Sequence, residues 1–115
     1  MAELCKFSGQ ILYRIDGNTV KDFYGRPLYI IDGDKLLKWD SRAILYRFDG
    51  YTIKDFYGRS LYSFDGTNFK DFYGRILYTY KNNSIAKFAS IAEYVVRPAA
   101  SVKEVAIFIL LFVIG

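Results

Sequence analysis

The chain has 115 residues, of which 52% are hydrophobic, 19% aromatic and 24% charged, and its formal net charge is +4. This composition predicts one folded domain and excludes a disordered chain, which would have few aromatic residues. The absence of histidine and the single cysteine exclude disulfide frameworks, His/Cys zinc sites and His-dependent catalytic triads. Basic and acidic residues are closely interleaved, which favours a mixed solvated surface over a nucleic-acid site.

Residues 1–10 are predicted to be an N-terminal lead-in to the domain. Their sequence, MAELCKFSGQ, has neither the positive start nor the apolar run of a secretory signal. We therefore expect a cytoplasmic protein in which Cys5 is reduced.

Residues 11–80 contain a nearly literal internal repeat. The motif KDFYGR begins at Lys21, Lys54 and Lys70, and Leu-Tyr and Asp-Gly pairs recur with the same step. A degenerate copy lies midway between the first two motifs, with Trp39 aligned on Phe56. In the same alignment Arg42 falls on Arg59. The sequence thus predicts four full units and a fifth Leu-Tyr strand over residues 76–80.

Each unit is typical of a β-hairpin, because short apolar and aromatic segments flank an Asp-Gly turn. Val20 and Phe23, like their equivalents in the other units, are three residues apart, so placing both in the core requires a bulge or a twist. One such hairpin cannot bury its apolar face alone, whereas several can do so around a shared axis. We expect a closed ring, since the leftover strand could pair with the first.

The run of LYxxDGxxxKDFYGR units resembles the four-fold beta flower family of small bacterial proteins. The resemblance covers about residues 10–80 and implies four β-hairpins around a pseudo-four-fold axis, in a flower or propeller-like, mainly β fold. It implies no assigned activity. The segment Trp39-Asp40-Ser41-Arg42 departs from the family pattern.

Residues 81–115 are predicted to be a C-terminal helical segment. Apolar residues at three-to-four spacing from Ile85 to Val95 favour an amphipathic helix that ends at Pro98. A capping box over residues 101–104 indicates a second helix from Val102, although the β-branched residues that follow leave a buried strand as the alternative.

Residues 105–115 carry no polar side chain and must be buried. They are too short to span a bilayer as a helix, and a ring of short hairpins is expected to leave little room for a helix on its axis. We therefore expect this segment to pack across one open face of the ring or against a second copy, with an oligomer interface at Val105, Ile107, Phe108, Leu111 and Phe112. Membrane insertion is the alternative.

Two repeated sets are candidate ligand-binding residues. Four arginines could meet at one rim and bind a carboxylate or phosphate, although Asp/Arg pairing between hairpins is the simpler interpretation. Five tyrosines could form an aromatic rim, although core packing is the simpler interpretation for them as well. The two sets are Arg26, Arg42, Arg59 and Arg75, and Tyr13, Tyr29, Tyr46, Tyr62 and Tyr78.

The sequence favours a non-catalytic binding or scaffold module that associates with itself through its apolar C-terminus. The alternatives are a peripheral membrane protein that inserts residues 105–115 and a binder of a small anionic ligand on the repeat axis. No nucleophile and base stand at an interpretable spacing, so we expect no enzyme, no catalytic residue, no metal and no cofactor. The expected partner is a second copy or another protein, and not a nucleic acid.

Overall fold

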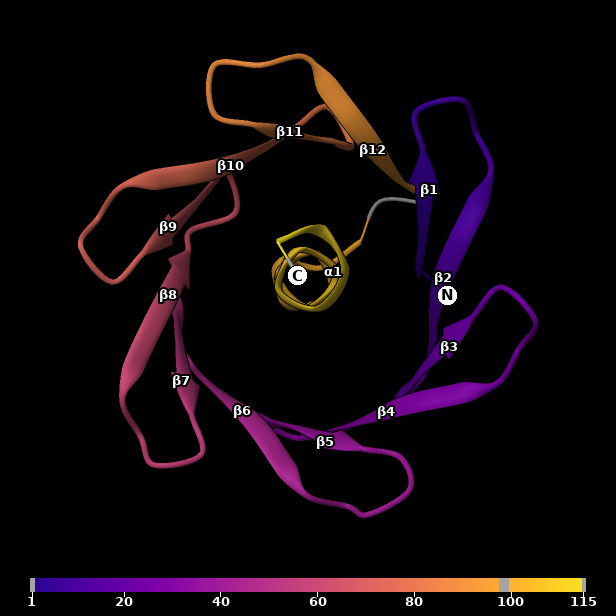
Figure 1. Cartoon of the computed structure of the whole chain (residues 1–115), viewed down its shortest axis with the longest axis vertical. Helices are drawn as coiled ribbons and strands as arrows, with labels where there is room; N and C mark the ends of the chain where they lie inside the picture. The colour runs from indigo at the N-terminus through magenta and orange to yellow at the C-terminus, as the bar shows by residue number, and fades with distance from the viewer. Residues whose placement is uncertain (1, 98–99, 115) are drawn as a thin grey trace.

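The computed structural model describes residues 2–97 and 100–114. In this part of the chain twelve strands form one closed antiparallel barrel, which a short C-terminal helix follows (Figure 1). Every strand pairs with its neighbours in chain order, and β1 pairs with β12. The strands are β1 (Ala2–Lys6), β2 (Ile11–Asp16), β3 (Thr19–Asp22), β4 (Pro27–Asp32), β5 (Lys35–Lys38), β6 (Ile44–Asp49), β7 (Thr52–Asp55), β8 (Ser60–Phe64), β9 (Asn68–Asp71), β10 (Ile76–Lys81), β11 (Ser84–Lys87) and β12 (Ala92–Arg97).

The predicted closure of the ring is confirmed, but the predicted count of four hairpins is too low. The residues expected to be a lead-in, 1–10, contain β1, whose Leu4 and Cys5 are fully buried. The ring closes through β1 and β12, and not through the leftover strand at residues 76–80. Neither of these two strands carries the Leu-Tyr and Asp-Gly motif of the central units, so the repeat does not predict them.

The amphipathic helix expected between Ile85 and Val95 is wrong, because this segment forms β11 and β12. The register of β11 against β12 shifts between Ile85 and Ala86, and β3 has the same kind of shift after Val20. A strand that bulges before a turn repeats its apolar residues at a spacing of three, which is also the spacing of a helix face. Pro98, the predicted helix end, lies outside the described residues.

The predicted second helix is confirmed. Helix α1 (Val102–Phe108) begins with the full capping box, in which Ser101 and Glu104 each accept a hydrogen bond from the other's backbone N–H. It continues as the π-helical turn η1 (Ile109–Val113). The expectation that the ring leaves little room for a helix on its axis is wrong, because α1 lies at the centre of the ring (Figure 1). A barrel widens with strand number, so twelve strands leave room for a helix where about eight are filled by their own side chains.

The core lies between this helix and the inner wall of the barrel. The helix contributes six consecutive buried residues, Val105 to Leu110. Six strands of the wall carry an almost completely buried residue at equivalent positions, namely Leu4, Val20, Leu36, Ile53, Phe69 and Ile85. Further buried wall residues are Ala2, Ile15, Phe64 and Val96. The apolar C-terminal segment therefore supplies the centre of the core.

The predicted bulges are confirmed, since the register shifts after Val20 in β3 and after Ile53 in β7. Their expected consequence is wrong, because Phe23, Phe56 and the residues equivalent to them are exposed. The bulge turns the chain outward after the buried wall residue, and the aromatic residue that follows lies in a turn.

Candidate binding surface at one end of the barrel

Six turns of the barrel carry an exposed aromatic residue at their second position. These aromatic turns connect β1–β2, β3–β4, β5–β6, β7–β8, β9–β10 and β11–β12, and comprise residues 6–10, 22–26, 38–43, 55–59, 71–75 and 87–91. Their aromatic residues are Phe7, Phe23, Trp39, Phe56, Phe72 and Phe88, which are 40–66% exposed. Ten of the twelve large exposed hydrophobic side chains in the described part of the chain lie in these turns. Concentrated exposed hydrophobic residues are typical of interaction surfaces, so these turns are the candidate binding surface.

The turn at residues 22–26 shows how the aromatic residues are held in the solvent. One oxygen of the Asp22 carboxylate accepts hydrogen bonds from the backbone N–H groups of Tyr24 and Arg26, both at 2.9 Å. The other accepts a hydrogen bond from Nε of Arg26, also at 2.9 Å. Gly25 has φ +86°, a conformation that glycine adopts without strain. Three side-chain hydrogen bonds thus fix a turn of five residues.

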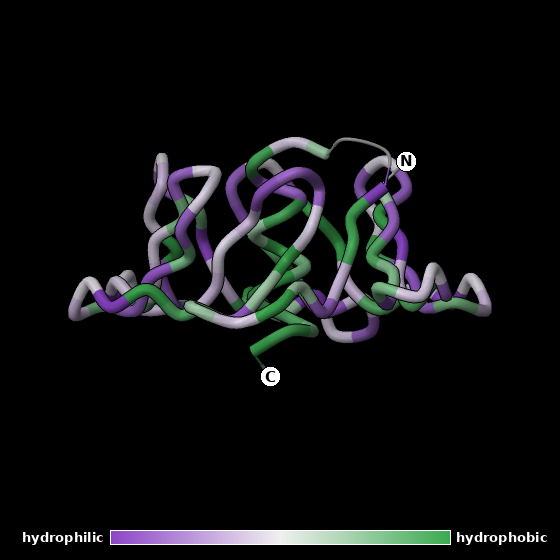
Figure 2. Tube along the Cα trace, turned by 90° about the horizontal axis from the view of Figure 1, so that it is seen from above, coloured by the Kyte–Doolittle hydropathy of each residue, from purple (hydrophilic) through white to green (hydrophobic). Residues whose placement is uncertain are grey.

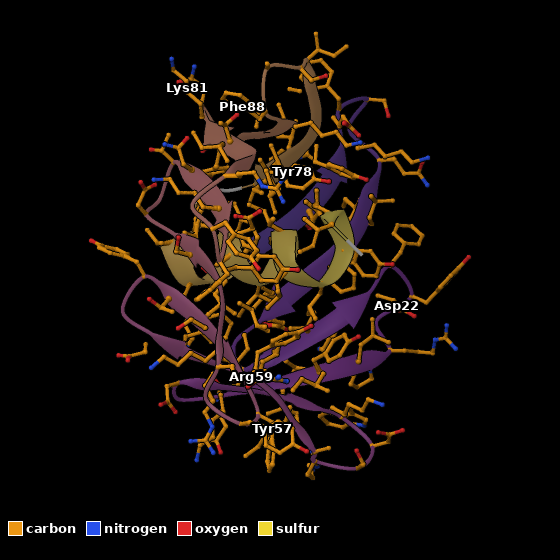
Figure 3. The ribbon with its side chains drawn as sticks, turned by 60° about the vertical axis from the view of Figure 1, so that its left-hand side comes forward. Asp22, Tyr57, Arg59, Tyr78, Lys81 and Phe88 are labelled. Carbon is orange, nitrogen blue, oxygen red and sulfur yellow. The ribbon has the colours of Figure 1, made fainter. Side chains whose placement is uncertain are left out.

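Two further turns repeat these contacts. Asp55 holds Tyr57 and Arg59 in the same way, and Asp71 holds the turn at residues 71–75. In each turn the tyrosine is 81–82% exposed, and Figure 3 shows Tyr57 at the periphery of the molecule. The backbone N–H of Arg26, followed by its side chain, holds the pKa of Asp22 below the usual range, so this carboxyl is ionised at neutral pH. The turns are therefore rigid supports for exposed aromatic rings.

The predicted cluster of four arginines does not form. Arg26, Arg59 and Arg75 each pair with the aspartate four residues earlier, at 2.7–2.9 Å. Their side chains are about three-quarters exposed at the outer rim, away from the axis that the helix fills. The axis on which an anionic-ligand site was expected is occupied by the helix, and three of the four arginines are paired with their own aspartates.

The alignment of Arg42 with Arg59 is wrong. Arg42 has φ +60° and its backbone N–H donates to the carbonyl of Lys38, so it occupies the place of the glycine in the other turns. Ala43 occupies the place of the arginine, because its carbonyl accepts from the backbone N–H of Lys38. One extra residue in this turn shifts the register. The Arg42 guanidinium lies 4.8 Å from the Trp39 ring centroid, a cation–π contact.

The predicted tyrosines line the barrel wall around the end of the central helix. Tyr13 stacks on Phe112 with ring centroids 3.6 Å apart, and Tyr29 meets the same ring edge-on at 6.3 Å. Burial raises the pKa of Tyr46, and nearby tyrosines add to the shift. Tyr62 packs against Phe69 at 5.2 Å. These four tyrosines are half-buried, so they serve mainly as core packing.

Tyr78 is the fifth member of this set, since Leu77-Tyr78 continues the motif. The hydroxyl of Tyr78 donates to the backbone carbonyl of Val113 at 3.3 Å, and Figure 3 shows its side chain close to the central helix. The tyrosine wall therefore anchors the last turn of the apolar segment.

The predicted oligomer interface is largely wrong. Val105, Ile107 and Phe108 are completely buried inside the barrel, so a second copy has no access to them. Leu111 and Phe112 are half-buried at the end of the helix and pack against the core. Within the described part of the segment, residues 105–114, only this end reaches the surface.

The helix end and the aromatic turns lie at the same end of the barrel. A groove of about 450 Å³ is lined by Ile114, by Phe88 of one aromatic turn and by Tyr62 and Tyr78 of the wall. Figure 2 shows the turns flaring outward at the end where the C-terminus emerges. We call the six aromatic turns together with residues 111–114 the aromatic face. The molecule is a disc of 36 × 35 × 20 Å, so this face is broad.

The two ends of the barrel differ in charge. The aromatic turns carry seven basic and four acidic residues: Lys6, Arg26, Lys38, Arg42, Arg59, Arg75 and Lys87, and Asp22, Asp40, Asp55 and Asp71. The opposite end, which we call the acidic face, consists of residues 16–19, 32–35, 49–52, 65–68, 81–84 and 101–104. It carries three basic and six acidic residues: Lys35, Lys81 and Lys103, and Asp16, Asp32, Asp34, Asp49, Asp65 and Glu104. The exposed aromatic residues thus share their end of the barrel with a surplus of positive charge.

In residues 2–97 and 100–114 no three potential metal-ligating side chains form a cluster. The same residues include no helix with the length and apolar character needed to cross a membrane. Comparison with known proteins finds no family model, no curated protein and no solved structure that matches this chain. The resemblance to the four-fold beta flower family stays a prediction.

Proposed function

We propose that this protein is a non-catalytic binding module whose aromatic face docks flat on the surface of an anionic lipid bilayer. The observation that carries the proposal is the concentration of exposed aromatic side chains at the end of the barrel that also carries surplus basic residues. Tyrosine and tryptophan favour the membrane–water interface, where an apolar ring and a polar edge are both accommodated. Lysine and arginine are attracted to anionic headgroups.

This mode of binding differs from insertion of residues 105–115, the alternative that the sequence suggested. The buried part of that segment stays in the barrel, and only residues 111–114 are available at the surface. The proposed contact is therefore shallow and spread over the aromatic turns. A cytoplasmic leaflet, which is rich in anionic lipids, suits this chemistry.

We further infer that the barrel consists of six copies of one hairpin unit, in place of four. The supporting observation is the regular spacing of the turn aromatics at positions 7, 23, 39, 56, 72 and 88. A ring of six equivalent turns makes several weak contacts at once. Multivalent contact of this kind gives a high overall affinity from individually weak sites.

The expected affinity has two parts. Each surplus basic residue near an anionic surface contributes about 1 kcal/mol, so a surplus of three gives about 3 kcal/mol at low salt. Each of the three most exposed tyrosines gains about 1 kcal/mol if roughly 40 Å² of its ring leaves water. These residues are Tyr24, Tyr57 and Tyr73.

Co-sedimentation with vesicles tests the proposal. We expect the protein to bind vesicles of phosphatidylcholine with phosphatidylserine, and to bind pure phosphatidylcholine much more weakly. The combined variant Tyr24→Ser, Tyr57→Ser and Tyr73→Ser should weaken binding about 100-fold, which corresponds to about 3 kcal/mol. The matched control is Tyr51→Ser, which removes a 65% exposed tyrosine from the acidic face and should leave binding unchanged.

Three outcomes would contradict the proposal. One is the absence of any preference for anionic vesicles, and another is an equal loss of binding in the control variant. The third concerns the self-association that the sequence favours. If light scattering finds a dimer that becomes a monomer in the triple tyrosine variant, the aromatic face belongs to a second copy of the chain and not to a membrane.

A further inference from the structure

A cavity of about 610 Å³ opens on the acidic face, between the start of α1 and the wall formed by β6, β7 and β8. We call it the side pocket. Its floor contains Phe64 and Ala106, and its wall contains Phe48 and Tyr51. Its size and largely apolar lining are those of a small-molecule site. None of these residues belongs to the aromatic face.

The side pocket arises where the chain departs from its own repeated pattern. The residue after each Asp-Gly pair is Asn18, Asp34, Tyr51 or Thr67, so only one such turn carries an aromatic side chain. That side chain is 65% exposed, and the neighbouring Phe48 is only half-buried.

The central helix carries a small side chain at the same place. Ala106 is the smallest side chain in the buried run from Val105 to Leu110, so the helix leaves space opposite this part of the wall. The aromatic side chains of Phe48 and Tyr51 therefore remain accessible in the side pocket. A larger residue at position 106 would fill that space.

The rim of the side pocket has no net charge. The Lys103 ammonium donates a hydrogen bond to the backbone carbonyl of Gly33 and lies 5.8 Å from the centroid of the Phe48 ring. The Asp34 carboxyl, of opposite charge, also lines the pocket. An anionic ligand would face Asp34 on an acidic surface, and a cationic ligand would face Lys103. The lining therefore favours an uncharged ligand.

We propose that the side pocket binds a small uncharged aromatic molecule with one polar group, of the phenol or indole class. The aromatic part packs between Phe48 and Tyr51 over the floor formed by Phe64 and Ala106. The polar group stays at the rim beside Lys103, where hydrogen-bonding groups and water are available. This site is separate from the proposed membrane-binding surface and does not depend on it.

Three probes with the same ring system test the charge preference by calorimetry at neutral pH. These are 2-naphthol, which is uncharged, 2-naphthoate, which is anionic, and 2-naphthylmethylammonium, which is cationic. We expect 2-naphthol to bind, and both charged probes to bind about tenfold or more weakly. The proposal would be overturned if either charged probe bound more tightly than 2-naphthol. It would also be overturned if the Kd of 2-naphthol were above about 1 mM.

Two variants place the site. Tyr51→Thr introduces the residue found at the equivalent position 67 and should weaken 2-naphthol binding roughly tenfold with an unchanged melting temperature. Its matched control, Tyr24→Thr on the aromatic face, should bind 2-naphthol like the unmodified protein. Ala106→Leu should abolish binding by filling the pocket, and circular dichroism reports whether this variant is folded. Undiminished binding in Tyr51→Thr, or an equal loss in Tyr24→Thr, would refute the location.

Discussion

Replacement of Phe108 by alanine tests whether the apolar C-terminal segment is the centre of the core. Phe108 is completely buried on the axis of the barrel. Because the barrel is closed, its strands cannot move inward to fill the cavity that removal of the phenyl group would leave. Phe→Ala changes at such sites cost about 3–5 kcal/mol. Unfolding entropy of about 2.1 cal/mol/K per residue gives roughly 0.24 kcal/mol/K for this chain, so a loss of about 4 kcal/mol lowers Tm by about 17 °C.

The matched control is Phe56→Ala, which removes the same atoms from a side chain that is 52% exposed in an aromatic turn. It should change the free energy of unfolding by less than about 1 kcal/mol. Urea and thermal unfolding, followed by circular dichroism, measure both variants. If Phe108→Ala costs no more than Phe56→Ala, the helix does not stabilise the barrel, and the assignment of the core is refuted.

Three further predictions concern the turns and the N-terminal strand. Ala89 has φ +61°, a conformation that glycine adopts without strain, so Ala89→Gly should stabilise the protein by roughly 1 kcal/mol. Gly58 has φ +86°, so Gly58→Ala should destabilise it. Midpoints of urea unfolding that move in the opposite directions would contradict the backbone assignment. The lowered pKa of Asp22, caused first by the backbone N–H of Arg26, gives a stabilisation that is complete above the ordinary value of 3.8 and is lost as the pH falls through the lowered pKa. Thermal unfolding between pH 2 and pH 5 should therefore depend less on pH in the combined variant Asp22→Asn, Asp55→Asn and Asp71→Asn, and an unchanged slope would disprove the role of these carboxylates. Cys5 is completely buried in β1, so a thiol reagent should label it only on unfolding, and rapid labelling of the native protein would show that β1 is not part of the barrel.

Local patterns in the sequence predict local features of this fold well. Asp-Gly pairs between apolar segments predict the turns of the central hairpins, and the capping box at Ser101 predicts the start of α1. The spacing between Val20 and Phe23 predicts a bulge. Each of these features depends on a few neighbouring residues, which is why sequence reasoning succeeds there.

The errors concern properties of the whole ring. β1, β11 and β12 have lost the motif of the central units, so the strand count, and with it the barrel diameter, could not be read from the repeats. The diameter decides whether a helix fits on the axis, and therefore whether Phe108 is buried inside the chain or available to a partner.

The candidate surface was missed for a related reason. A repeated phenylalanine is more often core than surface, and the sequence alone does not say on which side of a bulge the chain leaves the wall. The repeated arginines are evident in the sequence. Whether they meet depends on how far they lie from the barrel axis, which the sequence does not show. The longer step from Trp39 to Phe56 shows that this unit has one extra residue. The backbone hydrogen bonds of Lys38 place that residue in the turn at residues 38–43, which moves Arg42 to the glycine position.

Fluorescence of Trp39 tests the central claim most directly. This residue is the only tryptophan in the chain and lies in an aromatic turn with 40% of its surface exposed. We expect its emission to shift to shorter wavelength when phosphatidylserine-containing vesicles are added, and to be quenched by lipids brominated near the headgroup. The shift should be smaller at high salt, where attraction to headgroups is screened. If the protein binds these vesicles while Trp39 keeps its emission in water and is not quenched, another surface makes the contact, and the proposed role of the aromatic face is wrong.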